Sequence, residues 1–98
     1  MARYLMIWSL NTALIPTDSV ERGKGFAMLM EFIKRDIEKG LSKDWGSFVG
    51  EKSGYSIVEG TEVEISKMVQ QYSPYVNFKT HPVASLDQTA EVIASLIS

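Results

Sequence analysis

The feature that most constrains the fold is a short run near the N-terminus, Tyr4-Leu5-Met6-Ile7-Trp8, which is apolar at every position. Successive residues of a β-strand point to opposite faces of the sheet, so a strand that is apolar throughout needs cover on both faces. In a chain of 98 residues, helices can cover one of these faces. The other face then needs a partner chain or a ligand cavity.

The composition is that of a globular domain, with 45% apolar and 22% charged residues. The length fits a single domain, which we assign to residues 1–98. The chain has no cysteine, which excludes disulfides and thiolate metal sites. It has one histidine and no nearby carboxylate pair at ligand spacing, so we expect neither a metal nor a cofactor.

The charge pattern also excludes one class of partner. Proteins that bind nucleic acids usually carry a basic stripe, whereas this chain has a net charge of −2 and shows none. Its basic clusters at 34–35 and 39–43 are interrupted by Asp36, Glu38 and Asp44, a mixture typical of solvated surface. The apolar run is too short to span a membrane and lacks a cleavage site, so we expect a cytoplasmic protein without a membrane partner.

Hydrophobic periodicity predicts three helices and four strands. The first helix starts at the capping pair Asp18 and Glu21 and ends at Gly40, the second starts at Thr61 and Glu64 and ends before Pro74, and the third starts at Ser85 and Gln88. The buried stripe of the first helix is Phe26, Leu29, Met30, Ile33 and Ile37. The strands are predicted at residues 3–10, 44–50, 53–59 and 76–83.

This order, βαββαβ with an added C-terminal helix, predicts an α+β ferredoxin-like fold with a four-stranded antiparallel sheet. The first and third strands are expected in the centre, and right-handed crossovers place both main helices on one face. We expect these helices to cover the smaller set, Leu5, Ile7 and Ser9. The set Tyr4, Met6, Trp8 and Leu10 would then face outward, which favours a homodimer that packs sheet on sheet. The alternative is that the C-terminal helix folds back over this face.

The chain resembles a family of unknown function in the dimeric α/β-barrel superfamily. The resemblance rests on the element order, the strand Gly54 to Gly60 (GYSIVEG), the helix end Tyr72 to Tyr75 (YSPY) and the segment His81-Pro82-Val83. It implies a dimer formed through the sheets, with a ligand site between sheet and helices. The superfamily includes cofactor-free monooxygenases, muconolactone isomerases and haem-degrading enzymes, so the fold alone does not select an activity.

His81 is the best candidate for a catalytic residue, because it is the only side chain with a reference pKa near neutrality. The alternative is a strand-end histidine bonded to backbone or water. Asn11 ends the first strand, where a polar pocket residue is expected, although asparagine is also common in turns. Haem-degrading relatives use asparagine, tryptophan and histidine together, but His81 lies on or beside a strand rather than on a helix, which argues against haem chemistry.

The remaining pocket candidates are aromatic: Trp8, Trp45, Tyr55 and Tyr72. The two tryptophans could form the wall of a site for a flat ligand, or pack in the core or a dimer interface. The two tyrosines could donate phenolic hydrogen bonds into a cavity, and the alternative for Tyr72 is packing on the sheet. We therefore expect a protein that binds a small apolar or aromatic molecule between sheet and helices. The alternatives are a cofactor-independent monooxygenase or isomerase, and a non-enzymatic dimerisation or regulatory module.

Overall fold

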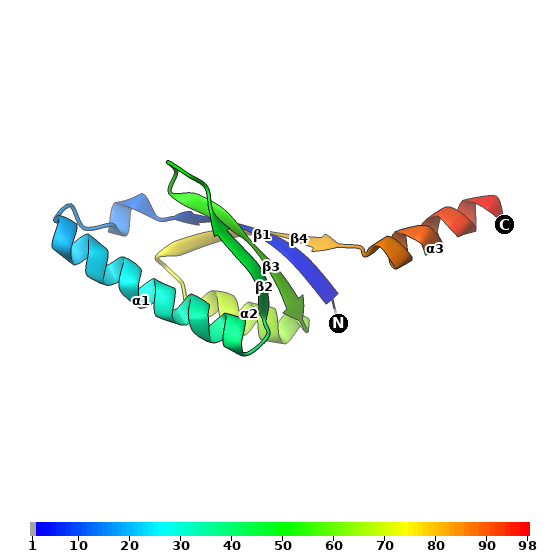
Figure 1. The fold of residues 1–98 in the computed structure, drawn as a ribbon, viewed down its shortest axis with the longest axis horizontal. Helices are drawn as coiled ribbons and strands as arrows, with labels where there is room; N and C mark the ends of the chain where they lie inside the picture. The colour runs from blue at the N-terminus through cyan, green and yellow to red at the C-terminus, as the bar shows by residue number, and fades with distance from the viewer. Residues whose placement is uncertain (1) are drawn as a thin grey trace.

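The computed structural model describes residues 2–98 and has the element order predicted from the sequence, with one additional 3-10 turn (Figure 1). The elements are β1 (Ala2–Leu10), a 3-10 turn (Thr12–Leu14), α1 (Ser19–Glu38), β2 (Ser42–Ser47), β3 (Ser53–Gly60), α2 (Glu62–Gln70), β4 (Val76–Val83) and α3 (Leu86–Ile97). The sheet is antiparallel with the order β2-β3-β1-β4. The prediction that β1 and β3 are central is confirmed, and the α+β arrangement is consistent with a ferredoxin-like fold.

The three main helices begin where the capping residues predict. The Asp18 carboxylate accepts a hydrogen bond from the backbone N–H of Glu21 at 3.0 Å. Thr61 with Glu64, and Ser85 with Gln88, form complete capping boxes in which each side chain accepts from the backbone of the other residue. These caps satisfy backbone donors that a helix start leaves without intrahelical partners.

The second strand differs from its predicted bounds. It was predicted at 44–50 and is observed at Ser42–Ser47, with a register shift between Ser42 and Asp44. The predicted end is wrong because Gly50 adopts a positive φ of 79°, which belongs to a turn rather than to a strand. The β2–β3 connection therefore starts at Phe48, earlier than the predicted turn at Glu51-Lys52, and Phe48 donates its N–H to the Ser53 carbonyl.

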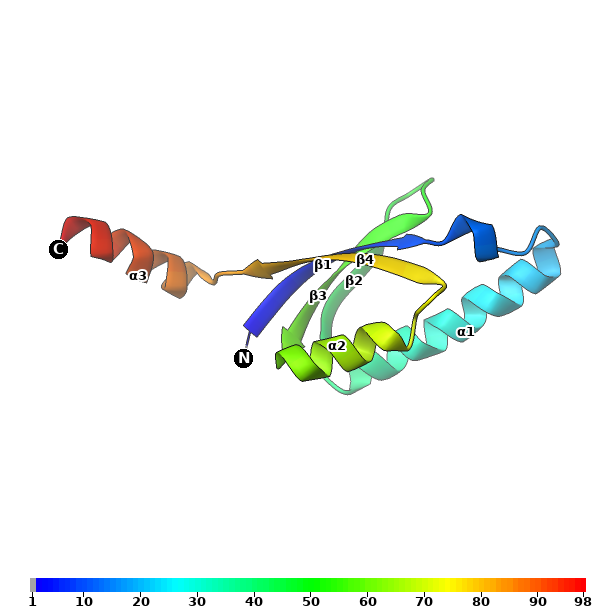
Figure 2. The same cartoon turned by 180° about the vertical axis from the view of Figure 1, so that it is seen from behind.

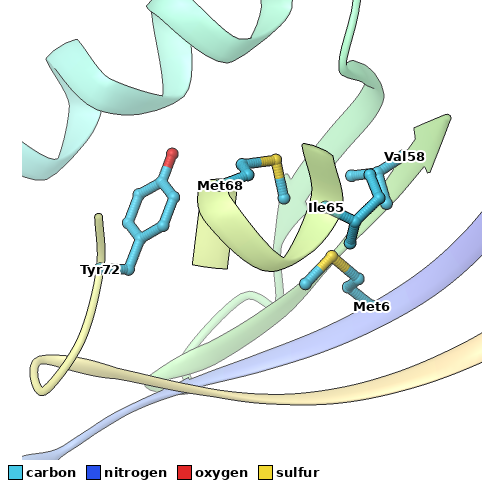
Figure 3. Packing of buried hydrophobic residues seen from close by; sticks show 5 residues of the cluster. All are labelled: Met6, Val58, Ile65, Met68 and Tyr72. Carbon is cyan, nitrogen blue, oxygen red and sulfur yellow. The ribbon is translucent and has the colours of Figure 1, made fainter. Parts of the chain in front are cut away.

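Both α1 and α2 lie on the same face of the sheet, as predicted (Figures 1 and 2). The side chains that they cover are the opposite set from the one expected. Met6 is completely buried and packs in one cluster with Val58 of β3 and with Ile65 and Met68 of α2 (Figure 3). The set Tyr4, Met6, Trp8 and Leu10 therefore faces the helices, and Leu5 and Ile7 lie on the outer face.

The neighbouring residues on β3 explain this orientation. Met6 pairs with Ser56 and Trp8 pairs with Gly54, so large side chains of β1 lie beside small ones on the inner face. On the outer face the pairs are Leu5 with Ile57 and Ile7 with Tyr55. Directly opposed residues share a face of the sheet. The small β3 residues therefore leave space on the inner face for both the bulky β1 side chains and the covering helices.

The C-terminal helix α3 does not fold back over the outer face, so that alternative is wrong. The helix projects from the end of β4 away from the sheet, and all its residues are exposed (Figures 1 and 2). This arm makes the molecule elongated, with principal extents of 61 × 26 × 18 Å. Across residues 2–98, no helix combines the length and the apolar character needed to cross a membrane.

Candidate functional site

A cavity of about 790 Å³ lies between the inner face of the sheet and α1. All four strands, both covering helices and the loop before α1 contribute to its wall. Its exposed lining residues come from the loop before α1, from the β2–β3 end of the sheet and from the N-terminal half of α1, where Phe26 and Met30 are exposed, which places the mouth at that end. The wall is mainly apolar and includes Trp8, Phe26, Leu29, Trp45, Met68 and Phe78.

Two stacked tryptophans form one part of the wall. The rings of Trp8 on β1 and Trp45 on β2 are 5.5 Å apart between centroids and nearly parallel, at 7°. The stack needs glycine at position 54, because a Cβ there would overlap the Trp8 indole and the Gly46 carbonyl oxygen. Trp8 Nε1 is buried and has no hydrogen-bond partner within residues 2–98, an arrangement that costs free energy.

The polar centre of the cavity is a buried carboxylate on α1. Asp36 is only 2% exposed and lies in the cavity wall. Its Oδ2 accepts a hydrogen bond of 2.5 Å from the Tyr72 hydroxyl, and its Oδ1 accepts one of 3.1 Å from Gln71 Nε2. Figure 3 shows the Tyr72 hydroxyl directed toward α1. Burial, together with the hydrogen bond to Asp36, raises the pKa of the Tyr72 phenol well above its ordinary value, so Tyr72 is a hydrogen-bond donor at neutral pH.

A second polar pair lies on the strands. Ser42 and Ser56 are both buried, and their hydroxyl oxygens are 3.0 Å apart in a hydrogen bond. Both residues line the cavity. Because each hydroxyl has further hydrogen-bonding capacity, this pair can donate to or accept from a bound molecule without leaving its partner.

The sequence-predicted site residues fall into two groups. Trp8, Trp45 and Tyr72 line the cavity, whereas Asn11, Tyr55 and His81 do not. Asn11 instead joins the end of β1 to the loop before β4: its Nδ2 donates to the Pro74 carbonyl and its backbone N–H donates to the Tyr75 carbonyl. The Asn11 side chain therefore bonds to backbone 63 positions away in sequence, and not to the nearby backbone that the turn interpretation predicts.

His81 and Tyr55 lie on the outer face of the sheet. His81 pairs with Leu5 and Tyr55 pairs with Ile7, and both partners point away from the helices. The Tyr55 hydroxyl donates to Asp44 at 2.9 Å, and this hydrogen bond raises the pKa of the phenol. The structure therefore separates His81 from Asn11 and from the tryptophans, and the three residues that echo haem-degrading relatives do not form one site.

Sequence reasoning missed Asp36, which was assigned to solvated surface, and placed Ile37 in the buried stripe instead. Ile37 is 49% exposed, whereas Asp36 is buried. A signal was present: Asp36 lies three residues after Ile33 and seven after Leu29, so it belongs to the same helical face. A charged residue on an apolar stripe indicates either a paired core group or a site.

Within residues 2–98, no group of three or more histidine, aspartate or glutamate side chains gathers where it could hold a metal ion.

No family model matches the chain, and no curated protein matches it. Membership of the dimeric α/β-barrel superfamily therefore stays a prediction.

Proposed function

We propose that this protein binds a small, largely apolar or aromatic molecule in the cavity between the sheet and α1. The observation that carries the proposal is the cavity itself. Its volume of about 790 Å³ falls within the range typical of ligand sites. Apolar walls with a few fixed polar groups are also the usual composition of such sites, and Asp36, Tyr72 and the Ser42–Ser56 pair supply those groups here.

The chain contains its own optical reporter for this proposal. It has two tryptophans, Trp8 and Trp45, and both line the cavity. A bound aromatic dye would lie close to the indoles, so excitation energy would pass from the tryptophans to a dye with a suitable absorption band. We choose the neutral dye N-phenyl-1-naphthylamine, which absorbs where tryptophan emits and becomes brighter in an apolar environment.

The experiment titrates the dye into the protein and measures emission sensitised by tryptophan. We expect saturable binding with one dye molecule per chain. Two exposed methionines of α1 provide a matched pair of variants, because Met30 lines the cavity and Met28 does not. Met30→Lys places a charge in the wall and should weaken dye binding, whereas Met28→Lys should leave it unchanged. Equal binding by both variants would place the dye elsewhere and contradict the proposal.

A second candidate function, a homodimerisation module, is favoured by the exposed arm α3. Its apolar side chains are largely uncovered, with Leu86 at 86%, Leu96 at 81% and Ile97 at 81% exposure. The outer face of the sheet also carries the partly exposed Leu5 and Ile57. Apolar surfaces of this kind on a small chain are typical of interaction sites.

We propose that the occupant of this surface is a second copy of the chain, with α3 of each copy on the outer sheet face of the other. The polar side of α3 carries the acidic residues Asp87 and Glu91, and the outer face of β4 carries Lys79 and His81. The negative charges of Asp87 and Glu91 and the positive charge of Lys79 are complementary, which favours this pairing over sheet-on-sheet contact alone.

Sedimentation equilibrium of the full chain tests the dimer. We expect twice the monomer mass at micromolar concentration. Ile93→Lys places a charge on the apolar stripe of α3 and should give a monomer, whereas Ser95→Lys adds the same charge on the opposite side and should leave the dimer intact. A monomer for the unaltered chain, or the same mass for both variants, would contradict the dimer.

A further inference from the structure

Among residues 2–98, Asp36 is the one buried charged side chain in the cavity wall. No cationic side chain of these residues pairs with it. The ion pairs of residues 2–98 join other residues, and the two hydrogen-bond donors to Asp36 are the neutral groups of Tyr72 and Gln71. Removing a carboxylate from water without a compensating charge is costly. Two carboxylate oxygens offer about four acceptor positions, so capacity for a further donor remains.

The rest of the cavity wall favours the same kind of charge. Five aromatic rings line it, and the faces of aromatic rings attract cations. The other charged lining residues are Arg22, Glu51 and Lys52. Glu51 and Lys52 are exposed near the mouth, and Arg22 donates to the Thr17 carbonyl in the loop beside it, so solvent screens these three charges more than that of Asp36.

We propose that the preferred ligand of the cavity is an organic cation, namely a protonated amine that carries an aromatic or aliphatic group. Its ammonium group donates a hydrogen bond to the Asp36 carboxylate, and its apolar part lies against the aromatic wall. This inference rests on the proposed function, since it names the ligand class for the same cavity. A charge-assisted hydrogen bond in a buried site is stronger than a neutral one, so the charge decides the preference among ligands of one shape.

The test compares three probes that share one ring system: 1-naphthylmethylammonium, 1-naphthalenemethanol and 1-naphthoate. Isothermal titration calorimetry of the full chain at neutral pH gives the dissociation constant of each probe. We expect the ammonium probe to bind about tenfold tighter than the alcohol, and the carboxylate to bind most weakly. This comparison uses the unaltered protein and so does not depend on any variant folding.

Variants then assign the preference to Asp36. Asp36→Asn keeps the shape and removes the charge, so the ammonium and the alcohol should bind within about twofold of each other. Glu51→Gln removes an acidic charge at the mouth and leaves the Asp36 carboxylate in place, so it should keep the preference. Far-UV circular dichroism checks that each variant is folded.

The outcomes separate this inference from the proposed function. If the unaltered protein binds the ammonium and the alcohol equally, the cation proposal is overturned while the cavity remains a binding site. If Glu51→Gln removes the preference as fully as Asp36→Asn, the charge that matters lies at the mouth and the assignment to Asp36 is wrong. If none of the three probes binds, the proposed function itself fails.

Discussion

Replacing Tyr72 with phenylalanine removes one hydroxyl from the centre of the molecule and has a magnitude that the structure allows us to work out. Tyr72 is 5% exposed and Asp36 is 2% exposed, and the hydroxyl donates to the Asp36 carboxylate. A hydrogen bond to a charged group contributes about 1.5–3 kcal/mol to stability. Gln71 still donates to the other carboxylate oxygen, and water that enters the cavity can replace part of the lost bond.

We therefore expect Tyr72→Phe to lower the free energy of unfolding by about 2 kcal/mol, which lies in the lower half of the range for a hydrogen bond to a charged group. Urea unfolding at neutral pH, followed by far-UV circular dichroism at fixed protein concentration, measures this change. With an m-value of about 1–2 kcal/mol/M, the urea midpoint should fall by about 1–2 M.

The matched control is Tyr75→Phe. Tyr75 is 47% exposed, and within residues 2–98 its hydroxyl makes no hydrogen bond, so its loss should change stability by less than about 0.5 kcal/mol. Combining Tyr72→Phe with Asp36→Asn should cost less than the sum of the two single changes, because both remove the same bond. Equal urea midpoints for Tyr72→Phe and Tyr75→Phe would refute the role given to the Asp36–Tyr72 pair.

Two further predictions concern the glycines and the pH dependence of stability. Gly54→Ala should lower the unfolding free energy by about 1–3 kcal/mol, because its Cβ would overlap the Trp8 ring and the backbone of β2. Gly23→Ala in α1 should raise the unfolding free energy by about 0.5–1 kcal/mol, because an added Cβ there meets nothing within 4 Å. The urea midpoints of the two variants check both signs. The pKa of Tyr72 is raised in the folded chain above the ordinary value of 10.0, so its contribution to stability is fully present below that pH and is lost as the pH rises above it. Urea midpoints between about pH 8 and about pH 11 should fall more steeply for the unaltered protein than for Tyr72→Phe, and parallel pH profiles would count against the raised pKa.

The order and type of the elements could be predicted from the sequence because local signals agree with the fold. The capping pairs at Asp18, Thr61 and Ser85 mark the helix starts. The strand that contains Pro82 lies at one edge of the sheet, as proline predicts. The end of β2 was misplaced because Phe48 and Val49 have strand-favouring side chains, while the conformation of Gly50 decides that the chain turns.

The orientation of β1 and the position of Asp36 could not be obtained from the local pattern. Every residue from Tyr4 to Trp8 is apolar, so the run itself does not indicate which parity faces the helices. That choice depends on Gly54 and Ser56, which lie nearly fifty residues away in sequence and become neighbours through the sheet register. In the same way, the buried carboxylate becomes tolerable through donors from Gln71 and Tyr72 at the end of α2, a contact between elements that periodicity does not report.

The most direct measurement of the central claim is a map of where an aromatic molecule contacts the folded chain. Nuclear magnetic resonance spectra of ¹⁵N-labelled protein, recorded during a titration with 1-naphthylmethylammonium, contain two indole N–H signals, from Trp8 and Trp45. A ligand in the cavity predicts shifts of both indole signals and of the Asp36 amide, with the amides of Leu86–Ile97 unchanged. Shifts confined to α3 and the outer face of β4, with both indole signals unmoved, would contradict a ligand site between the sheet and α1.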